Sequence, residues 1–318
     1  MHGYSDKAKT AWATSMIVEV VCYWAVPIFL MLTGATLMKY REKYDTKTYF
    51  KKRIMKVFIP FIIWATIMTI WKCSIGVLKI NDFSIKNILN IFFSNGEETT
   101  YYFMFLILGI YLTIPLLSVL SEEKNRKICW YTVIAIFVTK SILPIILKMF
   151  GVNYNTSLAI QLGDWAIYPL LGYLFSTHNF TKKQRTVIYI LGILAAIFRY
   201  SMTYYWTTTS HVLNKTLFGY TQFHSVLLSS AVFVFIKNID FNKKIESEKI
   251  TKFLSKIASC SFGIYLIHQI VMYYEKSIFV INSASWQWRT LGVISTYLIS
   301  LSIVYLLKKI PVVRKIVP

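Results

Sequence analysis

The chain has 318 residues, of which 56% are hydrophobic, 17% aromatic and only 15% charged, and its mean hydropathy is +0.51. A water-soluble domain carries charge on about a quarter of its residues, so this composition excludes an ordinary soluble protein. The net charge is +21, and a strongly positive charge is also typical of nucleic-acid-binding proteins. Basic residues held in the cytoplasmic loops of a membrane protein explain that charge without nucleic acid, and we expect no nucleic-acid partner.

Nine stretches are apolar enough, and at about 20 residues long enough, to cross a lipid bilayer as helices. They cover residues 15–38, 57–78, 101–120, 128–149, 158–176, 186–204, 218–236, 257–279 and 289–308. No linker and no internal repeat divides them. The sequence therefore predicts an all-α fold, a polytopic membrane helix bundle that forms a single domain over residues 1–318.

Lys and Arg are concentrated in every second connection between these predicted spans. The basic stretches are residues 39–56, 124–127, 182–185, 237–256 and 308–315. Because cytoplasmic loops of membrane proteins are rich in Lys and Arg, this pattern predicts a multi-pass protein of the cell membrane with a cytoplasmic C-terminus. Nine spans then place Met1 outside, whereas a tenth span ahead of Met1 would place the N-terminus inside. We therefore expect that the chain lacks the first helix of a longer protein.

The cysteines show no pattern that is typical of a metal or redox site. They are scattered along the chain, at Cys22, Cys73, Cys129 and Cys260. No CxxC motif or Cys/His spacing links them. We interpret them as small apolar residues, and we predict neither a metal nor a bound cofactor.

A basic segment follows the first predicted span. Lys52, Arg53 and Lys56 share a helical face because they stand at i, i+1 and i+4. A cationic collar against anionic lipid headgroups fits this pattern, and so does a cytoplasmic clamp for the phosphates of a donor. The composition of the segment does not separate these two interpretations.

Polar residues within the apolar spans are the other candidates for a site. His224 and His268 need a partner or a cavity, and Tyr265 lies three residues before His268, so those two side chains face the same side. For His268 a packing role and a site role fit equally well. Lys140 is nearest the middle of a span, where an unpaired charge costs about 3 kcal/mol, and it must face a partner or water. Less weight goes to charged residues near span ends, which can reach the interface: Glu19, Lys72, Asp164 and Arg199.

Four short patterns occur in order along the chain. They cover residues 23–34, with Val26-Pro27 and Gly34, residues 50–60, with the basic segment, and residues 102–115 and 262–268, the last reading Phe-Gly-Ile-Tyr-Leu-Ile-His. Each is weak alone, but together they resemble signatures of the acyltransferase-3 family of bacterial membrane acyltransferases. The chain departs from those signatures at three positions, with Thr33 for Ser, Lys56 for the second Arg of the basic segment and Tyr102 for Trp.

The resemblance implies ten helices with both termini in the cytoplasm. The first helix of the family carries an Arg and, further along, an essential His. His2 stands where that His is expected, whereas the Arg has no counterpart in this chain. The implied catalytic residue is therefore His2, as a base or a transient acyl carrier. Histidine suits this role because its pKa of about 6.5 lies near the working pH.

The resemblance further implies transfer of an acetyl or related acyl group from cytoplasmic acyl-CoA, such as acetyl-CoA, to a hydroxyl of a surface or lipid-linked carbohydrate. Arg53, Lys56 and Lys52 would bind the phosphates of CoA, although Lys in place of Arg loses the bidentate fork. Tyr265, His268 and Lys140 are candidates for the lining of the cavity. The implied partners are the lipid bilayer, acyl-CoA and the carbohydrate acceptor.

Two other classes of function remain open. One is an exporter of polysaccharide or lipid-linked sugar, since 22 Tyr, 22 Phe and 9 Trp suit sugar stacking, although interfacial belts explain many of them. The other is a sensing or anchoring module, or an inactive truncated member of the family. Dependence on acyl-CoA separates the transferase from both alternatives.

Overall fold

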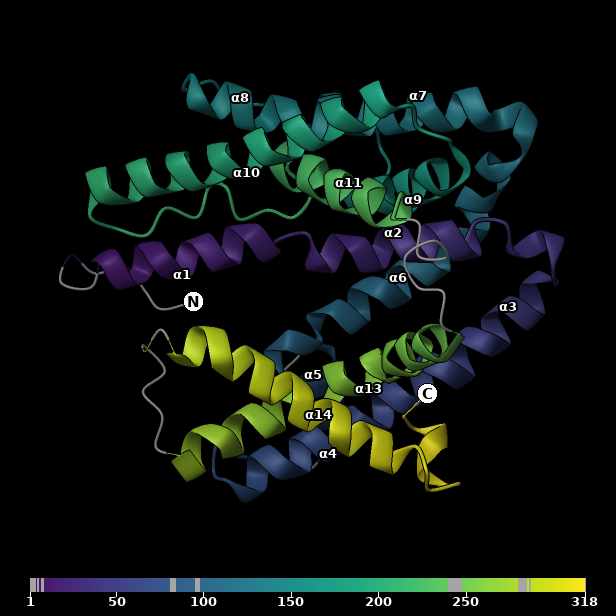
Figure 1. The fold of residues 1–318 in the computed structure, drawn as a ribbon, viewed down its shortest axis with the longest axis vertical. Coiled ribbons are helices and arrows are strands. Elements are labelled where there is room, and N and C mark those ends of the chain that lie inside the picture. The colour runs from purple at the N-terminus through teal and green to yellow at the C-terminus, as the bar shows by residue number, and fades with distance from the viewer. Residues whose placement is uncertain are drawn as a thin grey trace. The chain divides into compact units, whose positions relative to one another are not determined.

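A computed structural model describes residues 4, 6, 9–80, 84–94, 98–239, 248–279, 285 and 287–317 (Figure 1). Within these ranges all regular structure is helical and no strand occurs, which confirms the predicted all-α fold. The chain forms two compact units. Unit 1 comprises Met1–Asp45 and Ile110–Asp240, and unit 2 comprises Thr46–Gly109 and Phe241–Pro318.

In the part of the chain that the structure describes, seven helical stretches are long and apolar enough to cross a membrane. They are Lys9–Glu42, Thr46–Ser74, Thr99–Ser121, Glu123–Met149, Lys182–Ser210, Ile250–Phe279 and Trp288–Leu307. Each of them overlaps one of the predicted spans. The chain is therefore a polytopic bundle of apolar helices, as the sequence indicates.

The other two predicted spans, 158–176 and 218–236, begin later and are shorter than expected. Their helices are α9, Ile167–Thr177, and α11, Phe223–Lys237. The 15 residues of α11 rise about 22 Å, which is less than the hydrocarbon thickness of about 30 Å. The residues directly before α11 form a half-buried loop that contains Phe218 and Tyr220, and Leu217 beside them is fully covered. Hydropathy alone does not distinguish such a loop from a helix.

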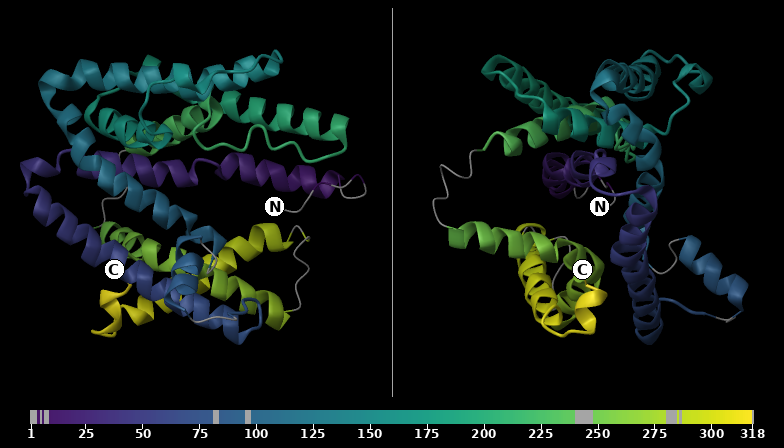
Figure 2. Two further views of the ribbon diagram at one scale, coloured as in Figure 1. Left: turned by 180° about the vertical axis from the view of Figure 1, so that it is seen from behind. Right: turned by 90° about the vertical axis from the view of Figure 1, so that its right-hand side faces the viewer.

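The remaining helices of unit 1 are α1 (Lys9–Cys22), α2 (Ala25–Leu37), α7 (Arg126–Ile136), α8 (Leu143–Met149) and α10 (Lys182–Ser210). Helices α1 and α2 continue in nearly the same direction across a short turn (Figures 1 and 2). Helix α2 packs on α9 through two glycines. A Cβ at Gly34 would lie 1.9 Å from the Pro169 carbonyl oxygen, and one at Gly172 would lie 1.9 Å from that of Met31. Small residues let two membrane helices touch backbone to backbone, so any side chain at either position would separate α2 from α9.

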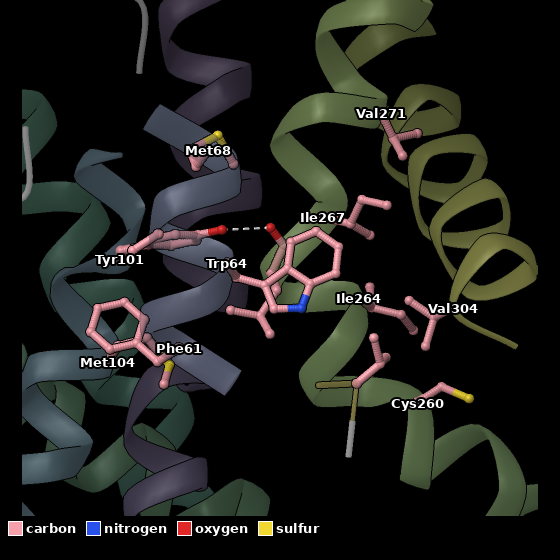
Figure 3. Close-up of a cluster of buried hydrophobic side chains, with 13 residues drawn as sticks. Phe61, Trp64, Met68, Tyr101, Met104, Cys260, Ile264, Ile267, Val271 and Val304 are labelled. Carbon is pink, nitrogen blue, oxygen red and sulfur yellow. Dashed lines mark hydrogen bonds between the residues drawn. The ribbon is translucent and has the colours of Figure 1, made fainter. Parts of the chain in front are cut away.

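Unit 2 contains α3 (Thr46–Arg53), α4 (Ile59–Ser74), α5 (Ile85–Phe93), α13 (Glu248–Phe279), α14 (Val293–Leu307) and the first half of α6 (Tyr102–Leu117). Its core joins α4, α6, α13 and α14 through buried aromatic and aliphatic side chains (Figure 3). Two polar bonds fix the register: the Tyr101 hydroxyl donates to the Leu266 carbonyl at 2.8 Å, and the Trp64 indole donates to that of Ile316 at 2.9 Å. Residues 262–268 of the last family-like pattern therefore lie against the core of unit 2.

Candidate functional site

The residues predicted to bind the donor lie where α3 passes into α4. Helix α3 ends at Arg53, and a single π-helical turn over Ile54–Phe58 carries Lys56. Lys52 and Lys56 are exposed, whereas Arg53 is half-buried, with its guanidinium carbon 5.9 Å from the centroid of the Tyr49 ring. The segment thus presents two ammonium groups to solvent beside a guanidinium that is held against an aromatic ring.

A proline follows the π turn of this segment. Pro60 has no N–H, so it cannot donate to the carbonyl four residues earlier, which is that of Lys56. The Ile59 N–H instead donates to Ile54, five residues back. The same spacing recurs in unit 1, where Lys140 stands four residues before Pro144 in the π turn Phe137–Ile142. Turns of this kind occur often at functional sites.

Lys140 has the partner that its position requires. Its ammonium lies 2.7 Å from the Asp164 carboxylate and 2.5 Å from the Leu162 carbonyl oxygen. The pair ties the π turn to the segment that precedes α9. Lys140 belongs to unit 1, whereas Tyr265 and His268 belong to unit 2. A structural role therefore accounts for Lys140, and its predicted place in a cavity lining stays a prediction.

Tyr265 and His268 lie on the same side of α13, with ring centroids 5.9 Å apart. The Tyr265 hydroxyl donates to the Thr100 carbonyl at 2.5 Å, so it anchors α13 to the turn that opens α6. The Nδ1 atom of His268 lies 2.6 Å from the Tyr265 carbonyl oxygen. A carbonyl only accepts, so Nδ1 carries the hydrogen and Nε2 keeps its lone pair. Nε2 accepts a hydrogen bond from the Gln269 amide nitrogen at 3.3 Å. Nε2 is also the atom that a general base would use.

An ion pair stands next to this turn in unit 2. Lys72 lies 2.9 Å from Glu98, whose other oxygen accepts from the Thr100 N–H at 3.0 Å and from the Thr100 hydroxyl at 3.2 Å. Burial by itself raises the pKa of the Glu98 carboxyl, but the Thr100 N–H and the Lys72 ammonium outweigh it and bring that pKa below its usual value. Glu98 is therefore held as a carboxylate with both oxygens occupied.

The predicted catalytic residue, His2, lies outside the described residues. The nearest described side chains are those of Tyr4 and Asp6. The Tyr4 hydroxyl donates to Asp6 at 2.5 Å, and Nδ1 of His211 lies 3.1 Å from the same carboxylate. The hydrogen bond to Asp6 raises the pKa of Tyr4 to about 12, and the bonds from Tyr4 and His211 lower the pKa of Asp6. These contacts tie the start of the chain to the end of α10, where His211 adopts a left-handed φ of 55°.

Arg199 of unit 1 is a buried charged residue to which the sequence analysis gave little weight as a site residue. Arg199 is 2% exposed, and its Nη2 lies 2.7 Å from Oε1 of Glu19, while its Nε donates to the Leu217 carbonyl at 2.9 Å. The guanidinium carbon lies 3.5 Å from the centroid of the Tyr23 ring. The sequence does contain an indication of this pair. Glu19 and Arg199 carry opposite charges and lie at similar depth from the outer ends of their two predicted spans.

Two atoms of this pair are not hydrogen-bonded. Nη1 of Arg199 and Oε2 of Glu19 are buried and have no partner within the described ranges. A buried, unsatisfied charged group is costly, and in folded proteins it marks strain, a bound water or a ligand. The pair nevertheless has a structural role, because the Leu217 carbonyl that Arg199 binds belongs to the buried loop before α11.

No group of three or more His, Cys, Asp or Glu side chains that could hold a metal ion occurs among the residues described. The cysteines at 22, 73, 129 and 260 are all free, and Cys129 and Cys260 are buried.

Comparison with known proteins gives one kind of match. Residues 1–305 match the family model of an acyltransferase domain. No curated protein and no solved structure matches the chain. The matched range covers nearly the whole chain, including the basic segment of unit 2 and the Glu19–Arg199 pair of unit 1.

Proposed function

The chain belongs to the acyltransferase-3 family, and on this premise we propose that it transfers an acetyl or related acyl group from cytoplasmic acyl-CoA to a hydroxyl of a surface or lipid-linked carbohydrate. The observation that carries the proposal is the domain match over residues 1–305 in a chain of several membrane-length apolar helices. The cell membrane is the proposed location. The alternation of basic loops supports a cytoplasmic C-terminus.

The donor is assigned to the basic segment of unit 2. Lys52, Arg53 and Lys56 would bind the phosphates of CoA, because guanidinium and ammonium groups form charge-assisted hydrogen bonds with phosphate oxygens. Lys52 and Lys56 are exposed, whereas Arg53 is half-buried. The positive-inside pattern puts this segment on the cytoplasmic side, where acyl-CoA is found.

The reaction requires a base. The acceptor oxygen attacks the thioester carbonyl and loses its proton to the base, the carbon–sulfur bond breaks, and the CoA thiolate leaves and takes up a proton. His2 is the base or the transient acyl carrier that the family relationship suggests. In the second case the His2 imidazole first takes the acyl group from sulfur and then passes it to the hydroxyl. His268 offers an Nε2 lone pair in unit 2 and is the second candidate for proton transfer.

The test is mass spectrometry of surface glycans from cells with and without the gene for this chain. Loss of ester-linked acyl groups from glycans of normal abundance is the expected result, and the modified sugar would identify the acceptor. His2→Ala should reproduce that loss at equal protein level. Acylated glycans that no longer reach the surface would favour an exporter. Unchanged acylation in the His2→Ala cells would exclude His2 as the base.

A further inference from the structure

A cleft opens at the end of unit 1 opposite the basic start of α10. It measures about 420 Å³ and is lined by Lys9, Thr10 and Ala13 of α1 and by Tyr200 and Tyr204 of α10. Small-molecule sites in proteins measure about 300–1,000 Å³, so the cleft is large enough for one sugar ring. Its lining mixes aromatic rings with a cation and a hydroxyl, which is the composition that a polar, flat-faced ligand needs.

The aromatic wall of the cleft is ordered by stacking. The rings of Tyr200 and Tyr204 lie 6.1 Å apart at 19°, and Trp12 stacks on Tyr204 at 6.0 Å and 25°. Tyr4 meets the Trp12 ring edge-on at 5.0 Å. Aromatic faces carry negative potential and attract the partly positive C–H groups on the face of a sugar ring. Both tyrosines line the cleft, so their rings are held where a sugar could contact them.

Hydrogen-bonding groups surround this wall. The Lys9 ammonium lies 5.4 Å from the centroid of the Tyr204 ring, and Thr10 is exposed beside it. Lys9 is also close enough to Asp6 to help lower the pKa of that carboxyl, after the larger effects of Tyr4 and His211. The lining thus contains an ammonium donor and a hydroxyl, which can bind the hydroxyls of a carbohydrate.

Two buried polar atoms lie in the helices that form the cleft, on residues outside its lining. The Trp12 indole nitrogen and the Thr203 hydroxyl are buried in the same pair of helices, and neither has a hydrogen-bond partner among the described residues. Both side chains are at most 2% exposed. Tyrosines of an interfacial belt would explain exposed single rings, whereas here two nearly parallel tyrosine rings line one cleft together with Lys9 and Thr10.

We propose that this cleft binds a sugar ring of the carbohydrate acceptor, which stacks on Tyr200 and Tyr204 with its hydroxyls at Lys9 and Thr10. This inference rests on the proposed function, because it locates the acceptor of that reaction. The cleft lies in unit 1, whereas the basic segment that would bind the donor lies in unit 2. Each side of the reaction can therefore be altered separately.

The experiment measures binding of an oligosaccharide to the full chain in nanodiscs of phosphatidylcholine. The probe is surface polysaccharide of the producing cells, cut to oligosaccharides and freed of esters with mild alkali. Tyr200→Ala and Tyr204→Ala should each raise the Kd about tenfold, because each removes a stacking surface. Tyr204→Phe keeps the ring and should stay within about twofold of the wild type.

Tyr205→Ala is the matched control, because Tyr205 is 60% exposed on the same helix and does not line the cleft. Equal Kd values for the wild type and both cleft variants would overturn the inference while leaving the proposed function intact. Binding of the same proteins to anionic lipid vesicles is measured in parallel. If both cleft variants lose affinity only for these vesicles, the cleft binds lipid headgroups and the inference is overturned. Absence of saturable oligosaccharide binding by the wild type would overturn the inference and the carbohydrate part of the proposed function together.

Discussion

The Lys72–Glu98 pair of unit 2 and the Glu19–Arg199 pair of unit 1 both lie away from the basic loops, and they differ in how completely they are hydrogen-bonded. In unit 2 the carboxylate of Glu98 binds Lys72 through one oxygen and Thr100 through the other. In unit 1 the Glu19–Arg199 pair shares one bond and leaves Nη1 and Oε2 without partners within the described residues. Complete bonding is typical of a structural pair, whereas incomplete bonding indicates a place where water or a ligand completes the site.

The largest expected effect comes from breaking the pair of unit 1. Arg199→Met leaves the Glu19 carboxylate half-buried without its partner and frees the Leu217 carbonyl. We expect a loss of about 3 kcal/mol in the free energy of unfolding. Equilibrium unfolding in mixed detergent micelles measures this change. The double variant Glu19→Met/Arg199→Met should recover most of the loss, because it removes both buried charges. A single variant as stable as the wild type would show that the pair contributes nothing.

Breaking the pair of unit 2 should have a smaller effect. Lys72→Met removes the partner of one Glu98 oxygen, whereas the other oxygen keeps its bonds from Thr99 and Thr100. We expect a loss of about 1–2 kcal/mol, measured in the same unfolding assay. A larger loss than that of Arg199→Met would reverse the comparison between the units.

The Glu98 pair should also show a pH dependence. Its folded pKa lies below the ordinary value of 4.5, so the pair stabilises the fold above pH 4.5 and loses this contribution as the pH falls through the lower, folded value. Glu98→Gln should therefore be less stable than the wild type at pH 7, with the difference disappearing below pH 4.5. Thermal unfolding of both proteins from neutral to acidic pH gives the two curves. Parallel curves over the whole range would contradict the assignment.

The smallest effect is expected at the basic segment of unit 2. Lys56→Ala should raise the KM for acyl-CoA about threefold to fivefold, as loss of one exposed ionic contact costs up to about 1 kcal/mol. Lys56→Arg should lower that KM, because it restores the bidentate fork. Neither change should alter the Kd for oligosaccharide, which is assigned to unit 1. A change in oligosaccharide binding would show that the division of donor and acceptor between the units is wrong.

Hydropathy and charge predicted most of the fold, because long apolar helices and basic loops are local properties of the sequence. They overestimated the lengths of α9 and α11, because apolar residues before these helices, such as Leu158 and Leu217, lie in loops. Lys140 was predicted to need a partner, and Asp164 is that partner. Arg199 received less weight because it lies near a span end, yet it forms a buried ion pair with Glu19. A position near a span end suggests that a charged side chain reaches the membrane–water interface. Only the tertiary packing shows that Arg199 is covered instead.

The candidate site was less predictable than the fold. The proximity of Tyr265 and His268 follows from their spacing, whereas the tautomer of His268 depends on a carbonyl contact that only the folded helix shows. The π turns could not be anticipated from proline alone, because Pro115 lies inside α6 without one and the π turn Trp288–Gly292 has no proline beside it. The cleft of unit 1 could not be anticipated either, since α1 and α10 are about 190 residues apart in sequence and no periodicity links them.

The central claim is acyl transfer from acyl-CoA to a carbohydrate hydroxyl, and its most direct test uses the purified chain in lipid vesicles. Acetyl-CoA labelled in the acetyl group is added with de-esterified surface oligosaccharide, and the products are separated and analysed by mass spectrometry. The account predicts labelled ester on the oligosaccharide, formed together with free CoA in equal amount and abolished by His2→Ala. Oligosaccharide that binds the chain yet stays unlabelled, while acetyl-CoA remains intact, would contradict the claim.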